Sequence, residues 1–186
     1  MMKTIRITAV MTALLLAAGT SALFAQDKLP AGMAKPVVDG VVKAGEYSYT
    51  HDFEQQLTLS ASRTADTLYF GVVGSTSGWV AVGLGSERMD GAAIFIGYVG
   101  TDGKVQFKPQ LGKGHRHGDA PSDISGSVVS YAMKEAGGKT TLEVAIKAAD
   151  FVKSGQASLD VIFAMGDQKS FSQYHTYRGA ASLALK

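Results

Sequence analysis

A methionine and a histidine 86 positions apart are the side chains of this sequence best suited to hold a redox-active metal. Met89 stands in the polar segment 85–91, between two strongly apolar runs, whereas most other methionines stand inside apolar runs. His175 stands in segment 173–179, just before the last apolar run. A neutral imidazole and a thioether together form an axial ligand pair for haem iron, and the soft thioether favours the ferrous state. With both axial positions filled, such a haem carries electrons and has no site open for a substrate.

Both side chains also have ordinary explanations. Met89 fits a methionine that fills a gap in loop packing, and His175 fits a hydrogen-bonded structural histidine beside aromatic residues. The loops of a β-sandwich cluster at its two ends, which would allow the two residues to meet. Another histidine pair, His115 and His117 with Asp119 nearby, could hold a divalent metal ion or simply belong to a solvated loop.

The sequence carries none of the common enzyme motifs. Gly83 and Gly85 form a G-x-G, but Arg88 occupies the place of the third glycine of a dinucleotide fingerprint. There is no P-loop, no G-x-S-x-G and no H-E-x-x-H. We therefore expect no catalytic activity of the chain's own, and at most a role as electron-transfer partner of a separate oxidoreductase.

Short apolar runs separated by turn residues must position these side chains. Two runs alternate with period two, 57–62 and 141–146, which predicts strands with one exposed face. Other runs are apolar at every position and predict central strands. They are 68–73, 79–84, 92–99 and 159–165, with shorter candidates at 105–108, 128–133, 171–174 and 182–185. Asp102-Gly103 predicts a hairpin, 148–153 one helical turn and 109–127 a long surface loop. The pattern predicts an all-β, immunoglobulin-like antiparallel β-sandwich.

The N-terminus has the three parts of a cleavable export signal. Lys3 and Arg6 precede the apolar run 9–18, and small residues follow, with Ala25 or Ala22 as the cleavage point. The run is too short to span a bilayer as a helix. We expect a signal peptide at 1–25, a flexible leader at 26–36, a single domain at 37–186, and a periplasmic or extracellular location.

Charge and cysteine content exclude several classes of partner. The chain has 18 Lys and Arg and 16 Asp and Glu, and loss of Lys3 and Arg6 leaves 16 of each. A neutral domain without a basic patch is unsuited to nucleic acid, and it lacks the polybasic cluster that binds membranes. Without cysteine, no disulfide, thiolate site or covalent haem attachment can form.

Three segments resemble the DOMON domain. These are Asp66 to Phe70, Gly78 to Gly85, and Met89 to Gly97; His175 with Arg178-Gly179 before a final strand is similar to the end of that domain. The resemblance covers roughly residues 36–186. It implies a β-sandwich that binds haem b noncovalently or a sugar. In haem-binding members a methionine and a histidine are the axial ligands, and these match Met89 and His175.

The resemblance also suggests roles for residues near His175 and for Trp79. Arg178 could pair with a haem propionate, and Tyr174 and Tyr177 could line the pocket, whereas Trp79 fits core packing better. Since such domains work beside another redox protein, we expect a separate redox partner. The rival hypothesis is a non-redox module for carbohydrate or another small ligand. It rests on the Asp39-Gly40 opening and on aromatic residues that could stack on sugar rings, namely Tyr47, Tyr49, Trp79, Tyr174 and Tyr177.

Overall fold

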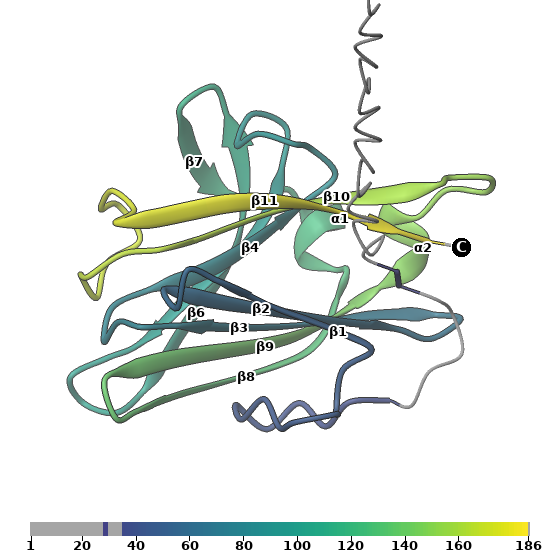
Figure 1. Cartoon of the computed structure of the whole chain (residues 1–186). Helices are drawn as coiled ribbons and strands as arrows, with labels where there is room; N and C mark the ends of the chain where they lie inside the picture. Colours follow the sequence, from purple (N-terminus) through teal and green to yellow (C-terminus); the bar gives the residue numbers. More distant parts are fainter. Residues whose placement is uncertain (1–27, 30–34, 186) are drawn as a thin grey trace, which may run out of the picture.

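Two antiparallel sheets lie face to face in the computed structural model, which describes residues 28–29 and 35–185 (Figure 1). One sheet has five strands in the order β1 (Tyr49–Phe53), β2 (Leu57–Arg63), β3 (Thr67–Gly74), β9 (Lys139–Lys147) and β8 (Val128–Ala136). The other has six, in the order β11 (Tyr177–Ala184), β10 (Ser158–Met165), β4 (Val80–Leu84), β5 (Ala93–Val99), β6 (Val105–Lys113) and β7 (Arg116–Asp119). The predicted all-β sandwich is confirmed.

Alternating apolar side chains from both sheets fill the space between the two layers. Phe70 of β3 meets Phe95 of β5 and Phe163 of β10 in one fully buried core. Along β10, every second residue from Leu159 to Met165 is buried, which is the period expected of a strand with one face on a core. Burial of this apolar surface is the main force that holds the layers together.

Several predicted element boundaries are wrong. Segment 171–174 is a loop, because Phe171 packs on the outer face of its own six-stranded sheet instead of continuing a strand. Segment 109–127 is largely ordered structure: β6 continues to Lys113, β7 follows, and α1 (Ser122–Ser125) is one helical turn. Strand β1 was not anticipated, and β11 begins five residues before the predicted 182–185. The hairpin at Asp102-Gly103 and the helical turn α2 (Ala148–Phe151) are confirmed.

The expected signal peptide, residues 1–25, lies outside the described residues, as does most of the expected leader. Of that leader, Leu29 is fully buried and its N–H donates to the Ala184 carbonyl at 2.6 Å, so this short stretch is held beside β11. Among the described residues, no helix is long and apolar enough to cross a membrane.

The outer face of the five-stranded sheet is covered by the segment that precedes β1. Val38, Val42 and Tyr47 pack on Tyr69 and Ala145 of that sheet. The covering segment explains why Ser60 and Ser62, predicted to be exposed, are buried. Ser62 Oγ accepts a hydrogen bond from the Ser48 N–H at 2.8 Å, so its burial leaves the hydroxyl paired.

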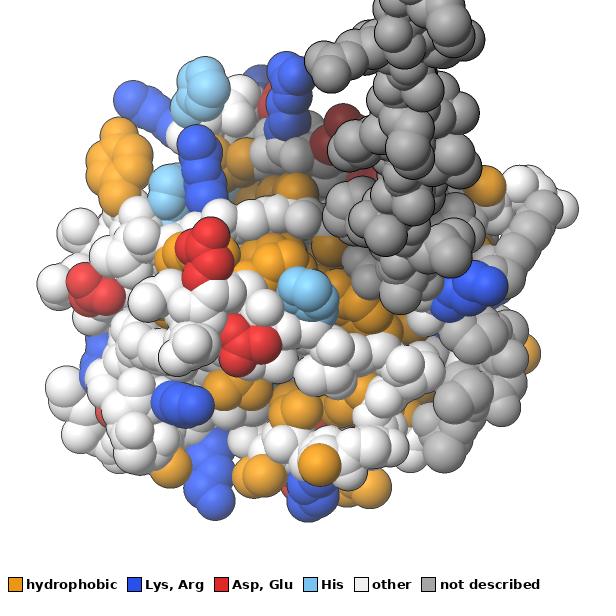
Figure 2. Space-filling model, viewed as in Figure 1, with side chains coloured by type: hydrophobic (Ala, Val, Ile, Leu, Met, Phe, Trp, Pro, Cys, Tyr) orange, Lys and Arg blue, Asp and Glu red, His pale blue; other side chains and the backbone are white. Residues whose placement is uncertain are grey.

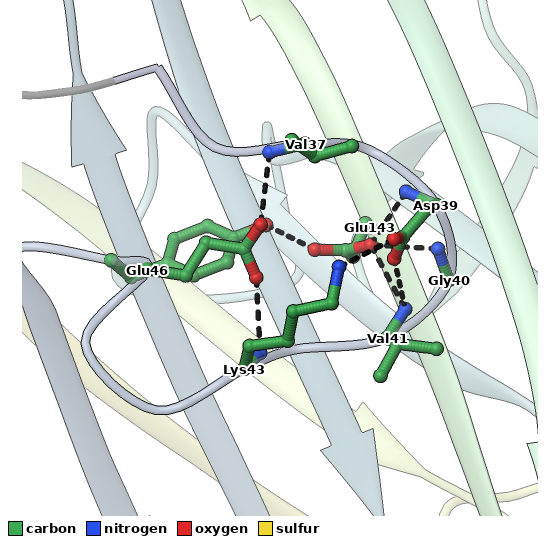
Figure 3. Close-up of polar contacts among 8 residues, drawn as sticks. Val37, Asp39, Gly40, Val41, Lys43, Glu46 and Glu143 are labelled. Carbon is green, nitrogen blue, oxygen red and sulfur yellow. Dashed lines mark hydrogen bonds and ion pairs between the residues drawn. The ribbon is translucent and has the colours of Figure 1, made fainter.

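A single buried carboxylate fastens this segment to the sheet (Figure 3). Glu143 of β9 is fully buried, and its Oε2 accepts the backbone N–H groups of Asp39, Gly40 and Val41 at 2.9, 2.7 and 3.1 Å. Its Oε1 accepts the Tyr47 hydroxyl at 2.7 Å. Burial and this contact with the carboxylate raise the pKa of Tyr47, so its hydroxyl stays protonated and donating.

Glu143→Ala should therefore destabilise the fold by about 3 kcal/mol, because the Asp39 and Gly40 N–H groups and the Tyr47 hydroxyl lose their acceptor. The Val41 N–H keeps a second acceptor, Asp39 Oδ1 at 3.0 Å. Tyr47→Phe, which removes one donor, should cost about 1 kcal/mol. The measurement is urea unfolding followed by circular dichroism, with exposed Glu87→Ala as control at about zero change. Equal stability of Glu143→Ala and Glu87→Ala would contradict the anchoring role.

Candidate functional site

The six-stranded sheet is apolar on both faces, although only one face lies against the other sheet. A second cluster of buried residues covers its outer face: Trp79, Ala81, Ala92, Ile94 and Ile96, with Met89, Tyr98, Ile162, Ala164 and Phe171 packed against them. A solvated outer face of an antiparallel sheet ordinarily carries polar side chains. Here the loops of the sheet itself cover the apolar face, through Met89 and Phe171.

The middle of this outer face is built largely from small side chains. We name it the apolar floor, and it comprises Ala81, Gly83, Ile94, Ile96, Ile162, Ala164 and Ala180. The strand register sets these residues side by side, with Gly83 opposite Ile162 and Ala81 opposite Ala164. A Cβ on Gly83 would lie 2.7 Å from Ile162 Cγ1, so only glycine fits there. Ile162 and Ala164 are half-buried and Ala180 is exposed, so the β10–β11 side of the floor reaches solvent.

Met89 lies over one end of the floor, on the loop between β4 and β5. Its side chain packs against the outer cluster, and its backbone sits directly on Gly112 of β6, where an added Cβ would lie 1.7 Å from the Met89 carbonyl oxygen. The loop is bonded to the β6–β7 hairpin: the Gly91 N–H donates to the Gly112 carbonyl at 3.0 Å, and the Gly114 N–H donates to Asp90 Oδ1 at 2.7 Å. In Figure 1 the loop stands beside this hairpin at the top of the view.

His175 comes from the opposite end of the same sheet, on the loop between β10 and β11, at the left of Figure 1. Because Met165 pairs with Val80 and Val161 with Leu84, this loop leaves the sheet at the end where β4 begins. His175 is half-buried, and it forms no hydrogen bond, ion pair or ring contact within the described part of the chain. The expectation that the two loops share one end of the sandwich is wrong, since β4 and β10 are antiparallel.

Several contacts hold the His175 loop across the outer face. The Gly166 N–H donates to the Trp79 carbonyl at 3.0 Å, and the Trp79 indole packs so closely on Gly166 that an added Cβ would lie 2.4 Å from Nε1. Phe171 rests on Tyr98 of β5, with ring centroids 4.9 Å apart. Lys169 Nζ donates to the Val99 carbonyl at 2.8 Å. The loop that carries His175 thus contacts Tyr98 and Val99 at the C-terminal end of β5.

The two other histidines considered from the sequence occupy the β6–β7 hairpin. His115 lies exposed in the turn, whereas His117 lies in β7, half-buried, opposite Gly112. His117 Nδ1 lies 2.6 Å from the amide oxygen of buried Gln110, which can only accept, so Nδ1 carries the proton. Burial lowers the pKa of His117. Met89 and His117 therefore both lie next to Gly112, an arrangement that sequence spacing did not reveal.

The remaining predicted residues separate onto different faces. Arg178 is exposed on the outer side of β11, opposite Ala164 of the floor. Tyr177 packs instead against the core between the sheets, where burial raises its pKa, so it does not line the floor. Tyr174 is 90% exposed. Sequence analysis did not identify the residues of the apolar floor as a site. The pattern that could have identified them is that segments 79–84 and 92–99 are apolar on both faces of the sheet.

Two shallow hollows lie elsewhere and contain none of these residues. One, of about 260 Å³, is bounded by Arg63, Ala65, Asp66, Lys147, Ala148, Ala149 and Val152. The other, of about 250 Å³, is bounded by Asp123, Ile124, Asp150, Phe151 and Lys153. Among the described residues no three His, Asp or Glu side chains are grouped to hold a metal ion.

Comparison with solved structures finds likenesses of fold. The cytochrome b domain of pyranose dehydrogenase from Coprinopsis cinerea superposes with a TM-score of 0.53 at 11% identity, over 73% of this chain and 80% of that chain. The cytochrome domain of cellobiose dehydrogenase from Myriococcum thermophilum gives 0.47 at 16% identity, over 74% and 81%. A family 9 carbohydrate binding module from Caldicellulosiruptor kristjanssonii, in complex with glucose, gives 0.46 at 11% identity, over 86% and 95%.

The first of these likenesses supports the sandwich fold that the DOMON resemblance implies. Comparison of the sequence with family models and with curated proteins finds no match.

Gly112→Ala should displace the Met89 loop, because the new methyl group would overlap the Met89 carbonyl oxygen. We expect a loss of about 1–3 kcal/mol in unfolding free energy, together with amide shifts in residues 85–92. The matched control is Gly118→Ala on the same hairpin, where an added Cβ meets nothing within 4 Å. An unchanged stability and spectrum for Gly112→Ala would show that the loop does not rest on β6.

The imidazole of His117 should titrate below its ordinary value of 6.5, since burial disfavours the charged ring. The His117 ring is then protonated less readily in the folded chain than in the unfolded chain. The free energy of unfolding therefore falls as the pH drops below about 6.5. NMR titration of the His117 ring gives the midpoint directly. A midpoint above 6.5 would mean that a negative charge, rather than burial, dominates its surroundings.

Proposed function

We propose that this chain is an exported haem b protein that holds its haem noncovalently on the apolar floor and relays electrons. Met89 and His175 would be the axial ligands. The observation that carries the proposal is the pair of loops: both fold onto the same apolar face, and they approach it from opposite ends of the strands.

Each loop would supply one ligand to the haem iron. Met89 would supply its thioether sulfur and His175 an imidazole nitrogen, and the two loops leave the sheet at opposite ends. The stretch from Ala92, beside the Met89 turn, to Tyr98, which contacts Phe171, spans roughly 20 Å at about 3.3 Å per residue. A haem bound on the floor would lie between the two loops.

The floor has the composition that such a group requires. Its alanines and isoleucines offer apolar contact to a flat apolar group. The indole N–H of Trp79 is buried without an acceptor among the described residues. Exposed Arg178 lies at the rim, where its guanidinium suits a propionate carboxylate. Met89 and Phe171 rest on the cluster in this structure, so a bound haem would replace part of these apolar contacts.

With both axial positions taken by the protein, the iron would exchange electrons and would not bind a substrate. The partners would be separate redox proteins outside the cytoplasm, because the N-terminal segment has the parts of an export signal. The absence of cysteine requires noncovalent attachment.

Burial argues against the carbohydrate hypothesis. Of its five aromatic residues, Tyr47, Tyr49 and Trp79 are less than 10% exposed, and Tyr177 faces the core. Only Tyr174 is freely exposed, and one ring does not make a stacking platform.

Titration of the purified chain with haem should give one haem per chain and the low-spin spectrum of a Met/His pair. Met89→Ala and His175→Ala should each yield a five-coordinate high-spin spectrum and lose affinity by about tenfold or more, since even second-shell partners are worth 10–100-fold. Met89→His should stay low-spin at a lower reduction potential, because the soft thioether that favours ferrous iron is gone.

His51→Ala is the matched control, since His51 is exposed on β1 of the other sheet and should leave the spectrum unchanged. A wild-type chain that stays colourless throughout the titration would overturn the haem proposal. Calorimetry with glucose and cello-oligosaccharides then tests the alternative hypothesis that the chain binds carbohydrate.

A further inference from the structure

Met89 and His117 both lie next to Gly112 on the outer face, although they are 28 positions apart in the sequence. Met89 occupies the position above Gly112 that a side chain would otherwise fill, with Met89 Cγ 3.2 Å from the ideal Cβ of that glycine. His117 is the cross-strand partner of Gly112, so its side chain leaves the sheet on the same face. The thioether and the imidazole are thus neighbours across one glycine.

The imidazole of His117 is oriented as metal-binding histidines usually are. Its Nδ1–H donates to Gln110 Oε1 at 2.6 Å, and Gln110 is 5% exposed. This bond fixes the tautomer, turns the ring and leaves the Nε2 lone pair without a partner among the described residues. Gln110 itself stands opposite Ile94, so the ring leans toward the cluster on which Met89 packs.

The donors themselves select the metal. A thioether and a neutral imidazole carry no charge, and together they prefer a soft monovalent ion to the harder divalent ions that carboxylates bind. The nearby carboxylates are engaged elsewhere: Asp90 Oδ1 accepts the Gly114 N–H, and Asp119 pairs with Lys108 at 3.6 Å. Figure 2 shows Lys, Arg and His side chains gathered at the top of the view, over the β6–β7 hairpin.

We propose that the haem-free chain binds one Cu(I) ion between Met89 Sδ and His117 Nε2, with Gln110 as the residue that positions the imidazole. The site is independent of His175, which lies on the loop at the opposite end of the sheet. It shares Met89 with the haem site, so copper and haem would compete for the same sulfur.

The test uses the full chain purified without haem, under anaerobic conditions with ascorbate, and Cu(I) supplied as its bicinchoninate complex. The wild type should withdraw one Cu(I) per chain from the coloured complex. Met89→Ala and His117→Ala should each weaken binding by tenfold or more, and Gln110→Leu by about tenfold, as expected for a second-shell partner. The same titration followed by NMR should shift the Met89 methyl and His117 ring signals together.

His115→Ala is the matched control, because this exposed histidine of the same hairpin lacks the Gln110 contact and should change the affinity less than threefold. Circular dichroism establishes that each variant is folded. The proposal is overturned if the wild type withdraws no copper, if Met89→Ala binds as tightly as the wild type, or if His115→Ala loses as much as His117→Ala. None of these outcomes depends on haem, so they leave the haem titration as a separate test.

Discussion

An apolar sheet face must be covered, and this constraint governs both outer faces of the sandwich. The inner faces cover one another around Phe70, Phe95 and Phe163. In the described part of the chain no further layer covers the outer face of the six-stranded sheet, and the loops that join its strands fold back over Ile94 and Ile96. Each loop brings one side chain that can bind a metal, Met89 from one end and His175 from the other. The candidate site therefore lies where these loops cover the apolar outer face of the six-stranded sheet.

The outer face of the five-stranded sheet is covered in a different way. There the segment before β1 covers Tyr69 and Ala145, and it is fastened by hydrogen bonds to one buried carboxylate, Glu143 (Figure 3). All four donors that point at this carboxylate are satisfied, which leaves no lone polar group for a ligand to meet. The Asp39-Gly40 opening therefore serves the fold. On the six-stranded sheet the cover consists of apolar side chains from two separate loops, which a ligand of similar character could displace.

Antiparallel pairing decides which metal-binding groups can act together. Because β4 and β10 run in opposite directions, the loops that follow them lie at opposite ends of the floor. Met89 and His175 therefore come from opposite ends of the floor, whereas Met89 and His117 both lie next to Gly112. The first pair is the one proposed to hold a haem, and the second is the one proposed to hold a single soft ion. Both proposals use the same methionine sulfur, so one chain would hold only one of the two at a time.

Local sequence determined the strands, the turns and the choice of Met89 and His175 as unusual residues, because strand periodicity and turn chemistry act over a few neighbours. It also excluded disulfides and covalent haem through the absence of cysteine. Segments whose structure depends on distant partners were predicted poorly: β7 exists because β6 pairs with it, and 171–174 is a loop because Phe171 packs on Tyr98. Tertiary structure alone decided that Tyr177 faces the core, that His117 lies beside Met89, and that the floor exists. Each of these follows from strand register and from the face on which a side chain emerges, and a shift of one residue in register would reverse them.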